Sequence, residues 1–148
     1  MKPTLTLLVG VPGSGKTTWA NKNHKENEVV LSSDLIRKEL FNDETNQENN
    51  KLVFTTLYNR ARRLLKSGKS VIIDATNVTI KDRSRALNNF ANFDVIKVAI
   101  VFKTATDICK FRDKNRTRTV GEEVIDKFTE KFINPTKEEG FDEIIYIE

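Results

Sequence analysis

The feature that most constrains this chain is segment 10–17, which reads GVPGSGKT and fits the whole of the pattern G-x-x-x-x-G-K-[ST]. It follows 5–9, a short apolar run typical of a buried strand, and it leads into 18–22, which contains no helix breaker. Strand, glycine-rich loop and helix in this order are the context that a phosphate-binding loop (P-loop) requires. The alternative is a glycine-rich turn before an ordinary helix, and the flanking segments favour the P-loop.

Anion capture explains why this loop needs these residue types. Glycines let backbone N–H groups turn inward around phosphate oxygens, and the N-terminus of the following helix adds about half a positive charge. Lys16 would reach the β- and γ-phosphates of a nucleoside triphosphate, and the Thr17 hydroxyl would ligate magnesium. The residues expected to bind ATP here are Gly10, Pro12, Gly13, Ser14, Gly15, Lys16, Thr17 and Thr18.

The composition fits one globular domain, which we expect to span residues 1–148. The formal net charge of +4 allows a polyanionic partner without requiring one, because ATP is itself an anion. One cysteine, Cys109, and one histidine, His24, exclude an intramolecular disulfide, a Cys/His zinc site and Ser-His-Asp hydrolysis. The longest N-terminal apolar run is too short to span a membrane, and no signal-peptide pattern precedes the first strand, so we expect a cytoplasmic protein with no membrane partner.

Strand and helix patterns alternate along the chain, which predicts an α/β fold with a parallel sheet covered by helices on both faces. Further strands are expected over 29–31, 70–74, 95–102 and 143–147, and further helices over 35–41, 51–66, 80–90, 107–116 and 122–132. With the P-loop strand at the centre, the five strands would take the order 2-3-1-4-5. Ligands of such sheets bind at the carboxyl ends of the strands, so segments 32–37 and 74–77 are candidates for the rest of the site.

The segment after the second strand contains a carboxylate and an arginine one helical turn apart. Asp34 could take the proton from an attacking hydroxyl, with Arg37 on the same helix face. The alternative is that Ser33 or Asp34 only caps the helix. The spacing is compatible with both interpretations.

The third strand ends at Asp74, where a carboxylate is unfavourable unless it has a partner. In a P-loop protein such an acid is a candidate magnesium ligand, and the alternative is a structural bond to the phosphate loop. Thr76 and Asn77 would then lie at the mouth of the acceptor site. Arg83 and Arg85 follow closely enough that one or both could bind an acceptor phosphate.

Basic residues stand at every second position from 110 to 118, which suits a helix end that passes into a loop closing over phosphates. We call residues 110–121 the lid. An arginine of the lid would neutralise charge on the transferring phosphoryl group, and Arg112 and Arg116, which share a helix face, are candidates to contact ATP. The alternative is a solvated basic face. A second basic group at 60–69 fits a solvated helix face.

Together these segments resemble the polynucleotide 5′-hydroxyl kinases of phage and animal nucleic-acid end-healing enzymes. The shared motifs occur in the family's order: the P-loop with Pro12, 33–37 (SDLIR), 73–77 (IDATN), 83–85 (RSR) and 115–118 (NRTR). Segments 134–136 (NPT) and 139–141 (EGF) also resemble the end of the kinase domain in the animal enzymes. The resemblance therefore covers nearly the whole chain.

The resemblance implies ATP-dependent phosphoryl transfer to the 5′-hydroxyl end of DNA or RNA, with Mg²⁺ as the metal cofactor and a role in nucleic-acid repair. It implies that Lys16 and Thr17 hold ATP with Mg²⁺. Asp34 would be the general base, and Arg37 would bind the acceptor phosphate.

The lid residues that the resemblance implies are Arg116 and Arg118, which would brace the ATP phosphates during catalysis. The lid is shorter than in phage members, so the assignment between these two arginines stays open. Two further positions depart from the family: Ser33 stands where arginine is usual, and Ala75 separates Asp74 from the Thr-Asn pair. The sequence has no D-x-D-G-T phosphatase signature, so we expect a stand-alone kinase without 3′-phosphatase activity.

Two other functions remain open. The same fold branch contains kinases of small alcohols, sugar-nucleotides and aminoacyl-tRNA, so a P-loop kinase of a small-molecule hydroxyl is the first alternative. A nucleotide-driven switch or ATPase is the second, although it needs a water-positioning residue, whereas Asp34 with Arg37 is typical of an acceptor site. DNA and RNA, ATP and GTP, and a monomer and a homo-oligomer all fit the sequence.

Overall fold

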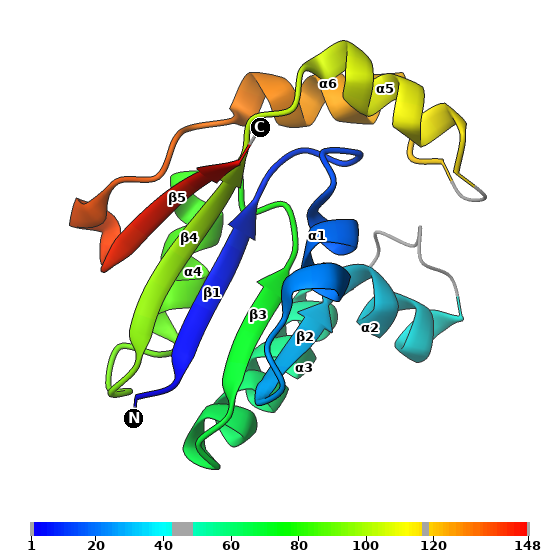
Figure 1. The fold of residues 1–148 in the computed structure, drawn as a ribbon. Coiled ribbons are helices and arrows are strands. Elements are labelled where there is room, and N and C mark those ends of the chain that lie inside the picture. The colour runs from blue at the N-terminus through cyan, green and yellow to red at the C-terminus, as the bar shows by residue number, and fades with distance from the viewer. Residues whose placement is uncertain (1, 43–48, 117–118, 148) are drawn as a thin grey trace.

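The central layer of the protein is a five-stranded parallel sheet. The computed structural model describes residues 2–42, 49–116 and 119–147. The strands are β1 (Thr4–Val9), β2 (Glu28–Ser32), β3 (Ser70–Asp74), β4 (Ile96–Phe102) and β5 (Glu143–Ile147). They pair in parallel in the order β2-β3-β1-β4-β5 (Figure 1). The predicted fold class and strand order are thus confirmed.

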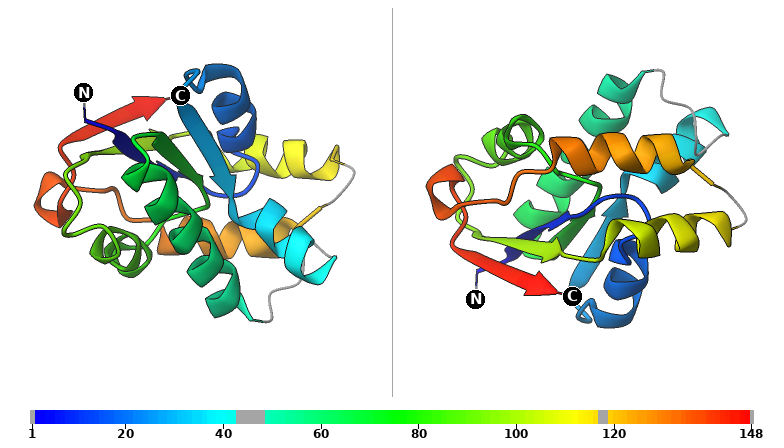
Figure 2. Two further views of the ribbon diagram at one scale, coloured as in Figure 1. Left: turned by 90° about the horizontal axis from the view of Figure 1, so that it is seen from below. Right: turned by 90° about the horizontal axis from the view of Figure 1, so that it is seen from above.

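Six α-helices in the described ranges surround the sheet. They are α1 (Lys16–Asn23), α2 (Ser33–Phe41), α3 (Asn50–Lys66), α4 (Ile80–Asn88), α5 (Thr106–Lys114) and α6 (Glu122–Lys131), followed by the 3₁₀ turn η1 (Lys137–Glu139). Helices α5 and α6 lie side by side across the carboxyl edge of the sheet, as both views in Figure 2 show. Within these ranges, no helix has the length and apolar character needed to cross a membrane.

Alternation along β1 divides the core between the two faces of the sheet. Leu5, Leu7 and Val9 are fully buried in a large cluster with residues of α2, α3 and α4. Leu8 points to the opposite face, where it packs in a smaller cluster with Ala20 of α1. Because successive strand residues face opposite sides, one central strand anchors both layers and fixes the position of the loop that follows it.

A buried ion pair ties α4 to the C-terminal part of the chain. The Arg83 side chain is 0% exposed. Its Nε donates to Glu139 Oε1 at 2.8 Å, its Nη2 donates to Glu139 Oε2 at 3.3 Å, and its Nη1 donates to the carbonyl oxygen of Asn77 at 2.9 Å. Glu139 Oε2 also accepts from the backbone N–H of Thr136 at 2.8 Å. These bonds fix η1 against the segment that follows β3.

We expect Glu139→Gln to destabilise the fold strongly, because it leaves the buried Arg83 guanidinium without a counter-charge. Loss of one partner of a buried ion pair costs about 3–5 kcal/mol. Urea unfolding followed by circular dichroism measures the change, with Glu138→Gln at the exposed neighbouring position as the matched control. Equal stability of the two variants would show that the Arg83–Glu139 pair does not hold this region together.

Candidate active site

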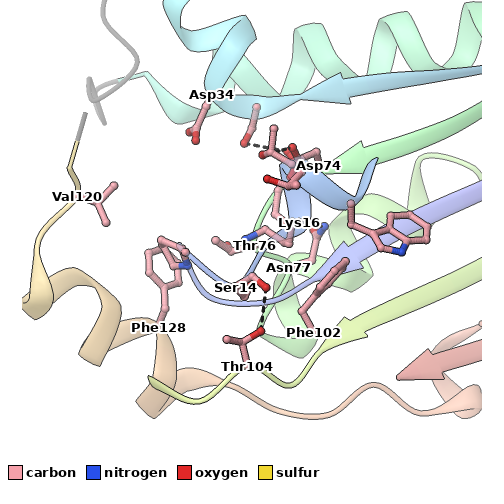
Figure 3. A pocket seen from close by; sticks show the side chains of 18 of the residues that line it. Ser14, Lys16, Asp34, Asp74, Thr76, Asn77, Phe102, Thr104, Val120 and Phe128 are labelled. Atoms are coloured by element: carbon pink, nitrogen blue, oxygen red, sulfur yellow. Dashed lines mark hydrogen bonds between the residues drawn. The ribbon is translucent and has the colours of Figure 1, made fainter. Parts of the chain in front are cut away.

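The P-loop lies between β1 and α1 in a backbone conformation that only glycine adopts easily. Gly13 has φ 83° and Gly15 has φ 99°. A Cβ atom at Gly13 would lie 2.5 Å from the carbonyl oxygen of Cys109, so the loop is packed directly against α5. The Thr104 hydroxyl donates to the carbonyl oxygen of Ser14 at 2.9 Å (Figure 3). The loop is therefore held by its contacts with α5 and with Thr104.

Lys16 begins α1 and is 8% exposed. Its Nζ donates to the carbonyl oxygen of Val11 at 3.0 Å. Burial lowers the pKa of Lys16, and the charges of Asp74 and Asp34 oppose that shift. A triphosphate placed in the loop would supply further negative charge to this desolvated ammonium, so Lys16 fits the phosphate-binding role.

Thr17 and Asp74 meet beside Lys16. The Thr17 Oγ1 donates to Asp74 Oδ2 at 2.7 Å, which is the structural bond that was the alternative for Asp74. Burial raises the pKa of Asp74, while the Thr17 bond and the charge of Lys16 act in the opposite direction. A hydroxyl and a carboxylate side by side are the hard oxygen donors that Mg²⁺ prefers, so the pair also fits a magnesium ion bound together with ATP phosphates.

The P-loop opens into a cavity of about 1400 Å³ along the carboxyl edge of the sheet. Figure 3 shows Asp34 and Asp74 on one side of this space, with Val120 and Phe128 facing them from the lid and α6. The expected site residues that line it are Pro12, Gly13, Ser14, Gly15, Lys16, Thr17, Thr18, Asp34, Arg37, Asp74, Thr76, Asn77, Arg85, Arg112 and Arg116.

Gly10 does not line the cavity but shapes the loop. Its backbone N–H donates to the carbonyl oxygen of Thr76 at 2.9 Å, and a Cβ atom here would lie 2.5 Å from Ser14 Oγ. Asn77 lines the cavity, yet its amide nitrogen donates to the carbonyl oxygen of Leu8 at 2.9 Å. Both residues therefore link the end of β3 to the β1 side of the site.

Helix α2 presents Asp34 and Arg37 to the cavity. The N-cap is Ser32, whose hydroxyl accepts from the backbone N–H of Leu35 at 3.2 Å, so neither Ser33 nor Asp34, the two residues of the capping alternative, is the cap. Arg37 Nη1 donates to Asp34 Oδ1 at 2.8 Å. The cap is thus provided one residue earlier, and the Asp34 carboxylate faces the cavity.

Arg37 is 4% exposed although it carries a full charge. Its Nη2 donates to Asn50 Oδ1 at 2.8 Å, which fixes the guanidinium between α2 and α3. Its Nε is buried and has no hydrogen-bond partner among the described residues. Sequence analysis missed Asn50, the first residue of α3, because none of the motifs includes it.

The two arginines expected near the end of β3 have different positions. Arg83 does not line the cavity, since its guanidinium is fully buried against Glu139 and Asn77, so the expectation that it clamps an acceptor phosphate is corrected. Arg85 does line the cavity, with its side chain 49% exposed and Nη2 3.7 Å from Asp82 Oδ1. The two positions differ because α4 turns one face to the core and the other to the cavity.

The basic residues of the lid make two kinds of contact. Lys110 pairs with Asp126 at 2.8 Å and Lys114 pairs with Glu122 at 3.3 Å, so these two lysines join α5 to α6. Arg112 points to the P-loop instead, with Nη1 3.4 Å from the carbonyl oxygen of Gly13. Arg118 lies outside the described residues.

Arg116 is held by Asp113, a residue that the motif analysis missed. Asp113 is 2% exposed, and its Oδ1 accepts from Arg116 Nη2 at 2.5 Å and from the backbone N–H of Val120 at 3.0 Å. Its Oδ2 accepts from the backbone N–H of Gly121 at 2.9 Å. Burial by itself raises the pKa of Asp113, but these hydrogen bonds and the Arg116 charge outweigh it and lower the pKa. One acid inside a run of cations was the available signal.

We expect Asp113→Asn to destabilise the lid. The asparagine NH₂ group would replace one carboxylate oxygen, and it cannot accept the hydrogen bond that a backbone N–H group donates there. Loss of hydrogen bonds to a charged group costs about 1.5–3 kcal/mol, or roughly 3–10 °C in Tm for a chain of this size. Differential scanning calorimetry measures the shift, with Asp107→Asn on the exposed face of α5 as the control.

The pH dependence of this difference follows from the direction of the pKa shift. A carboxyl group whose pKa is lowered on folding stabilises the protein above its unfolded pKa and loses this contribution as the pH falls through the folded pKa. The difference between parent and Asp113→Asn should be complete at pH 7 and shrink below about pH 4. A difference that is constant down to pH 2 would contradict an ionised Asp113.

The parallel sheet in the order β2-β3-β1-β4-β5, with a P-loop after β1 and a strand-end carboxylate bonded to the P-loop threonine, is a P-loop kinase fold. The chain belongs to the AAA domain family, whose model matches residues 5–135. It is 28% identical over 150 residues to the L-seryl-tRNA(Sec) kinase of Methanococcus maripaludis. The aligned region covers 93% of this chain and 56% of that relative. It is 27% identical over 142 residues to the bifunctional polynucleotide phosphatase/kinase of Schizosaccharomyces pombe. That aligned region covers 93% of this chain and 31% of the relative.

A solved structure with the same fold comes from the Pnkp1/Rnl/Hen1 RNA repair complex. A chain of that complex superposes with a TM-score of 0.78 at 23% identity, over 88% of this chain and 44% of the other. This chain spans about half the length of the L-seryl-tRNA(Sec) kinase and about a third of the polynucleotide phosphatase/kinase. The family model establishes that the chain belongs to the AAA domain family, and its activity and acceptor are separate questions.

Proposed function

We propose that the protein transfers the γ-phosphoryl group of ATP to the 5′-hydroxyl end of a polynucleotide. The observation that carries the proposal is that the Asp34–Arg37 pair lines the same cavity as Lys16 and Thr17. A phosphate donor site and a carboxylate able to accept a hydroxyl proton thus open onto one space. The similarity to a polynucleotide phosphatase/kinase supports this acceptor class, and a role in nucleic-acid end repair is the corresponding proposal.

The donor side of the proposed reaction rests on the P-loop. Backbone N–H groups of the loop and the Lys16 ammonium would hold the β- and γ-phosphates, while Thr17 and Asp74 would hold Mg²⁺. The metal would supply charge neutralisation at the phosphate oxygens. Arg112 lies close enough to the loop to contact the same phosphates.

The acceptor side rests on α2. Asp34 would accept the proton of the attacking hydroxyl, as carboxylates do in kinases. Arg37 keeps Asp34 in place and would contact the phosphate on the 3′ side of the first nucleotide, for which its guanidinium is suited by charge and planar geometry. Arg116 would leave Asp113 to neutralise the transferring phosphoryl group, with Arg118 as the other candidate.

Similarity to an L-seryl-tRNA(Sec) kinase favours a second candidate, transfer to the hydroxyl of a different acceptor. Both reactions would use the same donor site and the same base. They differ in whether a phosphate next to the reacting nucleoside improves the acceptor. That phosphate therefore decides between them.

Asp34→Asn tests the base. The substitution keeps the shape and removes the basic carboxylate, and because Ser32 is the helix cap, α2 should remain folded. We expect kcat to fall by roughly two to four orders of magnitude with little change in ATP affinity. Steady-state kinetics and equilibrium binding of ATP measure the two quantities. Parental turnover in a folded Asp34→Asn protein would remove Asp34 from the mechanism.

Arg37→Lys tests the acceptor. A nucleoside 3′-monophosphate should be phosphorylated far better than the bare nucleoside, because an arginine–phosphate contact of about 1.5–3 kcal/mol corresponds to roughly 10–100-fold in kcat/KM. Arg37→Lys keeps the charge but loses the planar fork, so it should reduce this ratio, whereas Lys81→Gln on the exposed face of α4 should not. A parent enzyme that uses bare nucleosides, sugars or small alcohols equally well would instead be a metabolite kinase.

A further inference from the structure

A second cavity of about 460 Å³ lies next to the acceptor side of the main one. It is formed by side chains of α3, α4 and the residue that follows α4, and we call it the α3–α4 groove. Its lining includes Lys51, Phe54, Tyr58, Arg62, Arg85 and Asn89. Phe54, Tyr58 and Arg85 also line the main cavity, so the two spaces share a wall.

The described lining of the groove is cationic. Lys51, Arg62 and Arg85 line it, and no carboxylate does. Arg62 is held in place, because Nη1 donates to Asn89 Oδ1 at 2.5 Å and Nη2 donates to Asn59. Both of these partners are neutral, so the charge of Arg62 is not compensated by them. A concave surface with cations from two helices is suited to an anionic chain that passes along it.

Aromatic side chains occupy the wall between the groove and the main cavity. Phe54 and Tyr58 pack with ring centroids 5.9 Å apart, and Tyr58 packs edge-on against the buried Phe90 at 6.2 Å. Burial raises the pKa of Tyr58 to about 12, so its hydroxyl stays neutral at physiological pH. Phe54 is therefore backed by a rigid aromatic stack, and it is the partly exposed member that faces both spaces.

We propose that the α3–α4 groove binds the nucleotides that follow the first one in a single-stranded acceptor. This inference rests on the proposed function and deepens it, because it defines the substrate as a single-stranded 5′ end. Phosphates would lie against Lys51, Arg62 and Arg85, and a base would stack on Phe54. Bases are free to stack on a protein aromatic ring when they are unpaired, and positive grooves with aromatic platforms are the usual way in which proteins bind single strands.

Acceptor length and strandedness provide the test. The acceptors are a nucleoside 3′-monophosphate, a single-stranded hexanucleotide with a 5′-hydroxyl, and the same hexanucleotide sequence as a recessed 5′ end in a duplex. We expect the hexanucleotide to exceed the mononucleotide in kcat/KM by roughly tenfold or more, and the recessed end to lose that advantage. Arg62→Gln and Phe54→Leu should each reduce the hexanucleotide-to-mononucleotide ratio by roughly 3–10-fold.

Arg63→Gln is the matched control, because it removes the same charge from the next position of α3, which is exposed and outside the groove. Fluorescence anisotropy of a labelled hexanucleotide provides a readout that does not need catalysis. Arg62→Gln should reduce the slope of log K against log salt by about 0.7, and Arg63→Gln should leave it unchanged.

Each outcome has a separate meaning. Two results would overturn the proposed role of the groove but not the proposed 5′-phosphorylation: equal effects of Arg62→Gln and Arg63→Gln, or a recessed end that reacts as well as the single strand. Failure of the parent to phosphorylate any of the three acceptors would overturn the proposed function. Hexanucleotide binding that responds to Arg62 alone would still support the groove in that case.

Discussion

The desolvated charge of Lys16 is the constraint around which the site is built. An ammonium that is 8% exposed needs negative partners, and here they come from the ends of two strands: Asp74 is the last residue of β3, and Asp34 lies just after β2. The parallel sheet brings those ends to one edge, and the Thr17–Asp74 bond joins the P-loop helix to that edge. The same arrangement leaves room for a triphosphate, which would complete the charge balance around the lysine.

The lid and the acceptor helix both depend on acids that hold arginines in place. Asp113 holds Arg116 on one side of the cavity, and Asp34 holds Arg37 on the other. Each arginine is thus oriented by an acid three residues before it. In the proposed reaction this preorganisation lowers the free-energy cost of holding positive charge at the place where negative charge develops in the transition state.

Sequence reasoning identified the strands and placed Asp34 and Arg37 on one helix face, because strand patterns and i,i+3 spacings are local. It predicted the strand order by placing the P-loop strand at the centre of the sheet. It could not place Arg83, whose partner Glu139 is 56 residues away. It left open whether Ser33 or Asp34 caps α2, because Ser32, Ser33 and Asp34 are all good caps. Asp113 was overlooked although its i,i+3 pair with Arg116 is local, and its bonds to the backbone N–H groups of Val120 and Gly121 depend on the fold of the chain after α5.

The central claim is that ATP and a 5′-hydroxyl end react in the one cavity that the P-loop and α2 share. The most direct measurement is the position of the label after incubation of the protein with γ-labelled ATP, Mg²⁺ and a 5′-hydroxyl oligonucleotide, followed by nuclease digestion to nucleoside 5′-monophosphates. The account predicts label in the 5′-terminal monophosphate, and none when the oligonucleotide already carries a 5′-phosphate. Label found only in inorganic phosphate, or in acceptors without a nucleic-acid 5′ end, would contradict it.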